Sequence, residues 1–270
     1  MPINHNDYIC LDTETTGLSD TKQLCEIAAV IVDARKLEIK DQGIFHSLCK
    51  IIPDEKCEEY GIDVTSDKAL EVNGLTREDL ENAPDLKTVW KDFENWALYH
   101  NPTKNKWNAP IPVGQNLNFD MSLINNIHYG LYRGNRVLKS KYVGPTARKK
   151  MSKDELIDII NSQEFYKEPW KFGKKEIFHP SMKIEIMQFS HSFWESNKYP
   201  AKIRQDTVLD YLGIDRSKAH TALADTLRVA ELLIRWLKLH RQMSKDIDFD
   251  TNGETVLNID ELLKAYDKRK

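Results

Sequence analysis

Three short apolar runs, each followed by a polar stretch, constrain the fold of the first 52 residues most strongly. The runs cover Tyr8–Leu11, Ile27–Val32 and Gly43–Ile52, and the charged stretch 33–42 joins the last two. Runs of this length, rich in Ile, Val and aromatic residues, are typical of strands. Short connections between them favour antiparallel pairing, because a parallel crossover needs a dozen or more residues. The chain is therefore expected to begin with hairpin-connected strands.

Strand and helix signals alternate after this region. Helical periodicity of Val89, Phe93 and Trp96 predicts a helix over 85–99, and the Thr76–Asp79 stretch resembles a capping box. A strand is predicted at 111–114, and a helix after Asp120 with Leu123, Ile124 and Ile127 inward. A strand or helix start is predicted at 184–189 and a helix at 202–212. A long helix is predicted over about 222–240, with an apolar stripe of Leu223, Leu227, Ala230, Ile234 and Leu237. Strands in hairpins and then alternating with helices predict a mixed α/β sheet covered by helices.

Acidic residues stand at the ends of several predicted elements. Asp12 and Glu14 are two residues apart on a strand, so their side chains project from the same face. Asp120 lies where a strand gives way to a helix, and Asp225 lies in the first turn of the long helix. His220 precedes Asp225 by five residues and can share a site with it only from the loop before the helix. Each of these features alone is weak evidence of a site.

Four carboxylates that converge on one point repel one another unless cations neutralise them. Mg²⁺ and Mn²⁺ are the natural partners, since both ions prefer oxygen ligands. Two such ions, about 3.5–4 Å apart, activate a water and stabilise the leaving oxygen in phosphodiester cleavage. A neutral histidine beside them supplies a general base. The acids and His220 together predict a metal-dependent phosphodiesterase.

Three sequence motifs occur in the order typical of one enzyme family. Residues 12–18 read DTETTGL, residues 116–120 read NLNFD and residues 220–225 read HTALAD. Together they resemble the three exonuclease motifs of the DnaQ-like (DEDD) 3′→5′ exonucleases, over roughly residues 7–130 and 184–240. The stretches 73–76 and 83–84 are similar to the family as well. Thr221 stands where the Tyr-type subclass has tyrosine, so the chain resembles the His-type subclass.

The resemblance implies a ribonuclease-H-like fold, with a mixed five-stranded sheet flanked by helices. It implies that Asp12, Glu14, Asp120 and Asp225 bind two Mg²⁺ (or Mn²⁺) ions, and that His220 takes the proton of the attacking water. It also implies contacts to substrate, which we expect from Thr15, Leu18, Asn116 and Phe119. One departure is Gln115, which stands where the family often has histidine. That position is not a metal ligand, so the implied chemistry is unaffected.

Basic residues are concentrated in the middle of the chain. Between Asp120 and Asp154 there is no acid, whereas eight lysines and arginines occur, including Arg148, Lys149 and Lys150. Such a segment can guide a phosphate backbone, with its tyrosines stacking on bases, or can simply be a solvated loop. We expect the first, and assign residues 131–183 as a basic insertion within an exonuclease domain of residues 1–240. Residues 241–270 are expected to form a polar linker and a helical tail.

Composition excludes several other classes of protein. The chain has 40% hydrophobic and 30% charged residues, and a net charge of −3 that neither favours nor opposes nucleic acid. No apolar run is long enough to span a membrane and no signal peptide is evident, so we expect a cytoplasmic protein. The four cysteines have no metal-ligand spacing and are expected to be buried thiols. Residues 248–261 resemble an EF-hand loop imperfectly, and a solvated linker is the favoured interpretation.

The leading hypothesis is a 3′→5′ exonuclease that releases 5′-mononucleotides from single-stranded DNA ends, either free-standing or proofreading. An exoribonuclease of the same family is the first alternative, because no residue reports on the 2′-hydroxyl. A nucleic-acid-binding adaptor with a weakened site is the second. The tail is a candidate for binding a polymerase or for self-association.

Overall fold

The structure, a computed structural model, describes residues 6–19, 21–129, 176–194, 205–214 and 221–246. The chain divides into two compact units, residues 1–234 and residues 235–270. Of the second unit, the described part is the C-terminal end of one long helix. The expected basic insertion and C-terminal tail lie almost wholly outside the described residues. All other elements belong to the first unit.

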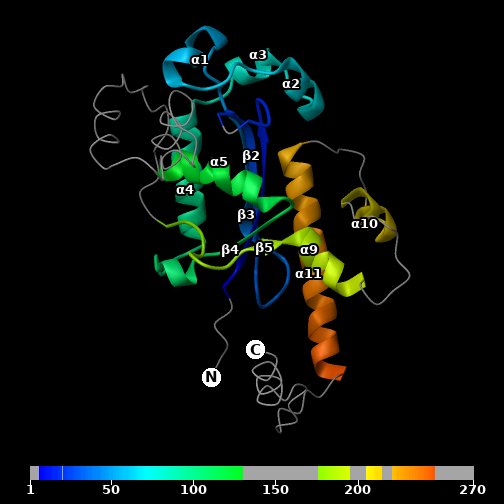
Figure 1. Ribbon diagram of the computed structural model, residues 1–270. Coiled ribbons are helices and arrows are strands. Elements are labelled where there is room, and N and C mark those ends of the chain that lie inside the picture. The colour runs from blue at the N-terminus through cyan, green and yellow to red at the C-terminus, as the bar shows by residue number, and fades with distance from the viewer. Residues whose placement is uncertain (1–5, 20, 130–175, 195–204, 215–220, 247–270) are drawn as a thin grey trace, which may run out of the picture. The chain divides into compact units, whose positions relative to one another are not determined.

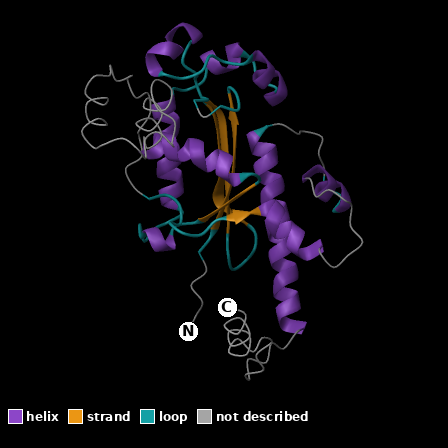
Figure 2. Ribbon diagram, viewed as in Figure 1, coloured by secondary structure: helices purple, strands orange, loops and turns teal. Residues whose placement is uncertain are grey.

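A five-stranded sheet forms the centre of the first unit (Figures 1 and 2). Its strand order is β3-β2-β1-β4-β5. The strands are β1 (Tyr8–Thr15), β2 (Leu24–Val32), β3 (Ile39–Leu48), β4 (Ile111–Gly114) and β5 (Ile184–Glu185). β1, β2 and β3 pair antiparallel, whereas β4 pairs parallel with both β1 and β5. The predicted mixed sheet is confirmed.

Helices pack on both sides of this sheet (Figure 2). The described helices are α1 (Asp54–Tyr60), α2 (Asp67–Asn73), α3 (Arg77–Glu81), α4 (Leu86–Tyr99), the 3₁₀ helix η1 (Lys106–Asn108), α5 (Leu117–Tyr129), α9 (Ile186–Trp194), α10 (Gln205–Tyr211) and α11 (Ala222–Asp246). Of these, α4 and α5 lie on one side of the sheet and α11 on the other, whereas α1–α3 lie beyond the end of the strands (Figure 1). Two predicted helix starts are confirmed by their hydrogen bonds. Thr76 and Asp79 form a reciprocal capping box, and the Asp85 side chain accepts a hydrogen bond from the Thr88 backbone N–H at the start of α4.

The main core lies between the sheet and helices α4 and α5. Ile9 and Leu11 of β1 pack there with Trp90 and Phe93 of α4, all of them fully buried. Leu123, Ile124 and Ile127 of α5 are also buried, as the sequence predicted. Since side chains alternate along a strand, Cys10, Asp12 and Glu14 face the opposite side of the sheet. That opposite side is the one that α11 approaches.

Helix α11 approaches this second face through β2, which lies between β3 and β1 in the sheet. All nine residues of β2 are buried, and Thr226 Oγ1 donates a hydrogen bond to the carbonyl oxygen of Ala28 at 3.4 Å. The predicted apolar stripe of α11 was wrong in part. Ala230 is buried as predicted, but Leu223, Leu227, Ile234 and Leu237 are only partly buried. Other buried residues of α11 are Ala222, Thr226, Val229, Leu232 and Leu233. The first turns of α11 meet β2 through Ala222 and Thr226, each of which donates a hydrogen bond to that strand.

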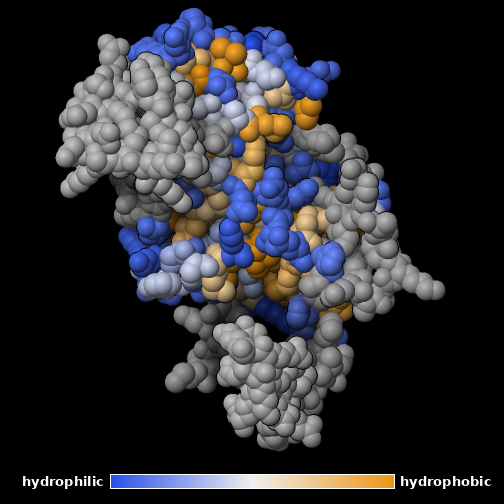
Figure 3. All heavy atoms as spheres, viewed as in Figure 1, coloured by the Kyte–Doolittle hydropathy of each residue, from blue (hydrophilic) through white to orange (hydrophobic). Residues whose placement is uncertain are grey.

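One strand begins earlier than the sequence predicted. β3 begins at Ile39 rather than Gly43, so the charged stretch contributes to the strand itself. The four cysteines are buried and free, as predicted. Apolar side chains reach the surface over α1–α3, where Val64 and Val72 are more than half exposed (Figure 3). No helix of the described segments is long and apolar enough to cross a membrane.

Candidate active site

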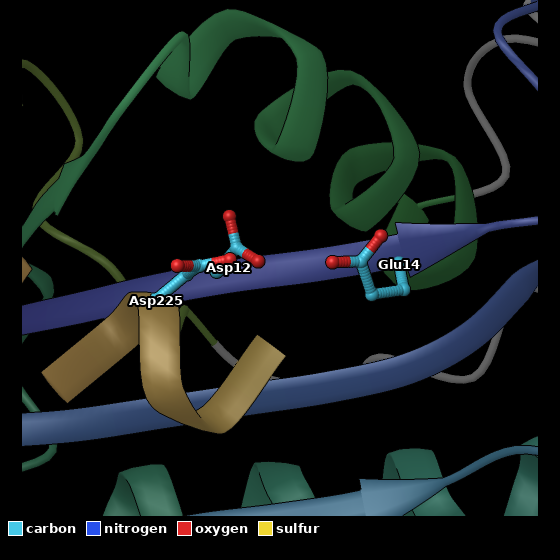
Figure 4. Close-up of side chains that lie close together, drawn as sticks. All are labelled: Asp12, Glu14 and Asp225. Carbon is cyan, nitrogen blue, oxygen red and sulfur yellow. The ribbon is translucent and has the colours of Figure 1, made fainter. Parts of the chain in front are cut away.

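Asp12 and Glu14 project from the same face of β1, as their spacing predicted (Figure 4). The strand holds both in place through pairing with β2, where Asp12 lies opposite Ala28 and Glu14 lies opposite Glu26. Both acids are partly buried, whereas their neighbours Leu11 and Thr13 are buried on the other face. Two carboxylates are thus carried by a rigid central strand.

Asp225 reaches the same place from the first turn of α11 (Figure 4). One oxygen each of Asp12, Glu14 and Asp225 lies within 4.8 Å of the others. We call these three residues the acid cluster. Arg228, one turn further along α11 and buried, places Nη1 at 2.6 Å from Asp225 Oδ1. The arginine therefore orients the Asp225 carboxylate from the protein side.

Asp120 lies beside the acid cluster on α5 and is buried. Pairing of β1 with β4 ends at Cys10 and Val113, so β1 continues beyond its neighbour on that edge. Asp120 Oδ1 satisfies this free edge, because it accepts hydrogen bonds from the Thr13 backbone N–H at 3.0 Å and from Thr13 Oγ1 at 2.6 Å. The fourth predicted acid is therefore tied to the strand that carries the first two.

The electrostatics of these acids are those of an unneutralised anionic site. Burial, together with the charges of Asp120, Glu14 and Asp225, raises the pKa of Asp12 well above its ordinary value. Burial and the nearby carboxylates raise the pKa of Glu14 to about 7. The pKa of Asp120 also rises to about 7 through burial, although its hydrogen bonds from Thr13 oppose the rise. Like charges this close favour proton uptake unless a cation is bound.

The donor set fits a divalent metal ion. Carboxylate oxygens are hard ligands of the kind that Mg²⁺ and Mn²⁺ prefer. The acid cluster could hold such an ion, since one oxygen of each acid lies within 4.8 Å of the other two. A bound cation would also offset the repulsion that raises the pKa values of Asp12 and Glu14.

Four of the predicted substrate-contact residues have described side chains. Two of them follow Glu14 in the sequence and the other two precede Asp120. Leu18 is 89% exposed on the loop after β1, and Thr15 is buried at the end of that strand, its Oγ1 donating to the Gly17 carbonyl oxygen. Phe119 precedes Asp120, and the Lys22 ammonium lies 3.1 Å from its ring centroid. Asn116 is exposed with φ of 52° and lines an open cavity of about 380 Å³ at the start of α5.

Other predicted site residues lie outside the described residues. They are the proposed general base His220 and the basic residues Arg148, Lys149 and Lys150. The EF-hand-like stretch 248–261 lies outside as well. Their roles remain predictions from the sequence.

The sequence analysis missed four charged residues around the site: Lys22, Glu26, Glu185 and Arg228. Glu26 could have been found, because it is the one charged residue in the apolar sequence of β2. Arg228 stands three residues after Asp225, a spacing that brings two helical side chains together. Burial lowers the pKa of Lys22 to about 8, and the charge of Asp120 opposes this effect. No local pattern marks Lys22 or Glu185, because each acts on a residue distant in sequence.

Comparison with known proteins identifies the class. The exonuclease family model, RNase_T, matches residues 9–159, which is more than half of the chain. The chain therefore belongs to the exonuclease family. No curated protein matches its sequence.

Solved structures share the fold at low sequence identity. The crystal structure of cell-death related nuclease 4 (CRN-4) matches with a TM-score of 0.51 and 14% identity, covering 87% of this chain and 65% of that one. The zinc-bound E. coli ExoI–ssDNA complex matches with a TM-score of 0.53 and 15% identity, covering 88% of this chain and 42% of that one. The chain thus covers less than two thirds of either protein's length. The similarity confirms the ribonuclease-H-like exonuclease fold.

Proposed function

We propose that the protein is a metal-dependent 3′→5′ exonuclease of the His-type subclass, which removes 5′-mononucleotides from single-stranded DNA. The observation that carries this proposal is the acid cluster, with one oxygen of each acid within 4.8 Å of the others, in a chain of the exonuclease family. The choice of DNA is supported by the ExoI structures, which were solved with single-stranded DNA and with a dA16 oligonucleotide.

In this proposal Asp12, Glu14, Asp120 and Asp225 hold two Mg²⁺ or Mn²⁺ ions, which, when bound, activate water and stabilise the leaving oxygen. His220 accepts the proton of the attacking water. Water adds to phosphorus, the bond from phosphorus to the 3′ oxygen breaks, and that oxygen takes up a proton. The products are a 5′-mononucleotide and a strand with a new 3′-hydroxyl.

The substrate is proposed to enter with its 3′ end toward the acid cluster. Leu18, which is 89% exposed, offers an apolar surface to the terminal base, and the backbone around Thr15 contacts the terminal sugar. Asn116 and Phe119 contact the strand from the side of α5. Arg148, Lys149 and Lys150 attract the phosphate backbone further upstream. Residues 241–270 are proposed as the segment that binds a polymerase or a second copy of the chain.

A matched digestion tests the proposal. Single-stranded DNA and RNA of the same sequence, each 5′-labelled, are incubated with the protein and Mg²⁺, with EDTA, or with the Asp12→Ala variant. We expect a Mg²⁺-dependent ladder that shortens from the 3′ end of the DNA and is absent with the variant. A ladder on RNA alone would keep the chemistry and overturn the choice of substrate. Binding of both strands without cleavage of either would replace the enzyme with an adaptor.

A further inference from the structure

Two helices at the site begin on a carboxylate supplied by a neighbouring strand. At the start of α5, the two oxygens of Glu185 accept the backbone N–H groups of Asn116 at 3.0 Å and Leu117 at 2.9 Å. At the start of α11, Glu26 Oε2 accepts the backbone N–H of Ala222 at 3.2 Å. The first N–H groups of a helix have no partner within the helix, and the helix dipole there favours negative charge. Each carboxylate therefore anchors a helix by its first turn.

The position of these anchors relative to the site acids is the same in both helices. Asp120 follows Leu117 by three residues, and Asp225 follows Ala222 by three residues. Three residues of helix rise only about 4.5 Å and complete most of one turn. A shift of the helix start therefore moves the aspartate by nearly the same amount. Asp12 and Glu14 need no such anchor, because pairing with β2 holds their strand directly.

Glu26 is fully engaged in this role although it lies on the same face as the acid cluster. It is 3% exposed and lies opposite Glu14 in the register of β1 and β2. Its Oε1 is 2.7 Å from His46 Nε2, while its Oε2 takes the Ala222 N–H. Both oxygens thus have protein partners. The bond from Thr226 to β2 holds the same turn of α11 a second time.

Glu185 is engaged in the corresponding way at the other end of the site. It lies on β5 opposite Gly114 of β4, the strand that leads into α5. Lys183, two residues earlier, places Nζ at 2.6 Å from Asn118 Oδ1. Three hydrogen bonds therefore tie residues 116–118, at the start of α5, to residues 183–185, and two of these bonds end on Glu185 of β5.

We propose that Glu26 and Glu185 are positioning residues that bind no metal and set the places of Asp225 and Asp120 by anchoring the helices that carry them. This inference rests on the proposed function for its catalytic consequence. Its structural consequence does not depend on that function: Asp225 and Asp120 are held in place for metal binding in the absence of substrate. Partners that orient metal ligands typically contribute about 10–100-fold to metal affinity or activity.

The test compares Mn²⁺ binding to the full-length protein, measured by electron paramagnetic resonance without substrate, with steady-state hydrolysis. Glu26→Ala and Glu185→Ala are expected to raise the Kd for Mn²⁺ and to lower kcat, each by about 10–100-fold. The KM for the oligonucleotide should stay within about twofold in Glu26→Ala, because α11 carries none of the proposed substrate contacts. The larger effect is expected at Glu26, the more buried of the two carboxylates. Glu26→Gln should recover most of the loss, because an amide oxygen can still accept the Ala222 N–H.

Asp85→Ala is a matched control. The Asp85 side chain accepts a backbone N–H at the start of α4, a helix that carries none of the site acids. This variant should lower the melting temperature and leave the Kd for Mn²⁺ unchanged. An equal change in the Kd for Mn²⁺ in Asp85→Ala and Glu26→Ala would mean that Glu26 only stabilises the fold and does not position Asp225. That result would overturn the proposal.

Two further outcomes are decisive. Folded Glu26→Ala and Glu185→Ala proteins with the wild-type Kd for Mn²⁺ would overturn the proposal. If Glu26→Ala does not fold, His46→Ala takes its place. This substitution removes the other partner of Glu26, and it is milder because the His46 side chain is 40% exposed. It should weaken Mn²⁺ binding by a smaller factor, and unchanged binding would contradict the proposal. A wild-type protein that binds Mn²⁺ but cleaves nothing would refute the proposed function, and the Mn²⁺ comparison would still test the anchors.

Discussion

Asp120 Oδ1 accepts two hydrogen bonds from a single residue, Thr13, through its backbone N–H at 3.0 Å and through its Oγ1 at 2.6 Å. Thr13 lies between Asp12 and Glu14 on β1, and its own side chain faces away from the acid cluster. The strand therefore positions three acids. Asp12 and Glu14 are its own side chains, and Asp120 is held by the two hydrogen bonds from Thr13, the residue between them.

Thr13→Val should lower kcat by about 10–100-fold, because it removes the buried Oγ1 bond to Asp120 while keeping the shape of the side chain. Thr13→Ser keeps the hydroxyl and should stay within about threefold of the wild type. Steady-state rates on single-stranded DNA at saturating Mg²⁺ measure both. Equal rates for the valine and serine variants would mean that the hydroxyl does not hold Asp120 in a catalytic position.

Asp12→Asn should reduce hydrolysis at least about a thousandfold, equivalent to about 4 kcal/mol of barrier. In EDTA at pH 8 its melting temperature should equal or exceed that of the wild type, because the substitution removes a charge that other buried acids repel. Calorimetry and the hydrolysis assay check the two effects. Asp92→Asn, at an exposed position on α4, is the control and should change neither quantity. A fully active Asp12→Asn protein would refute the assignment of the metal site.

The stability of the metal-free protein should fall as pH rises from about 6.5 to 8. The pKa values of Glu14 and Asp120 are about 7 in the folded protein and near 4 in the unfolded chain. Over this interval the folded state binds more protons than the unfolded state, so the free energy of unfolding decreases with pH. The contribution is fully present below pH 4 and is lost as pH passes the folded values.

Melting temperatures in EDTA across this interval test the prediction, with Glu14→Gln as the comparison. The variant should show a shallower decline, since it lacks one of the titrating groups, and saturating Mg²⁺ should remove most of the decline in the wild type. Parallel curves for the two proteins would show that Glu14 does not titrate in this range.

His220→Ala should lower kcat by about 10²–10⁴-fold, the usual contribution of a general base. The KM for DNA and the Kd for Mn²⁺ should change little, because the proposal gives His220 no ligand role. His191→Ala, at an exposed position on α9, provides the control. A loss of less than twofold would remove His220 from the chemical step.

Replacing Arg148, Lys149 and Lys150 with glutamine should weaken binding to all single-stranded sequences alike. It should also flatten the plot of log K against log salt by about 2, because each lost phosphate contact contributes about 0.7. Fluorescence anisotropy at several salt concentrations measures the slope. Replacing the exposed Lys87 and Lys91 of α4 is the control. An unchanged slope in the triple variant would mean that the basic segment does not contact phosphates.

Features set by local chemistry could be predicted from the sequence. The Thr76–Asp79 capping box and the shared face of Asp12 and Glu14 depend on residues at most three apart, and both were predicted, as was the start of helix α4 near Asp85. The resemblance to the family motifs also predicted that Asp120 and Asp225 lie near Asp12 and Glu14. In the structure Asp120 bonds to Thr13 of β1, and Asp225 lies beside Asp12 and Glu14.

Features set by tertiary contacts could not be predicted in this way. The buried side of α11 was predicted only in part, because an apolar stripe does not mark polar residues that find partners: Thr226 bonds to β2, and the buried Arg228 pairs with Asp225. Glu26 stands out as the one charged residue of β2, but the N–H group that it binds lies 196 residues away. The N–H groups that Glu185 binds lie 68–69 residues away, and no local pattern predicts such partners.

The most direct test of the account is single-turnover hydrolysis of a 5′-labelled single-stranded DNA by the wild type and by Asp225→Asn, each with Mg²⁺. We predict that the wild type yields labelled products shortened one nucleotide at a time from the 3′ end, and that the variant, with intact DNA binding, yields none. A labelled mononucleotide as the first product, or an equal ladder from the variant, would contradict a 3′→5′ exonuclease whose chemistry occurs at the acid cluster.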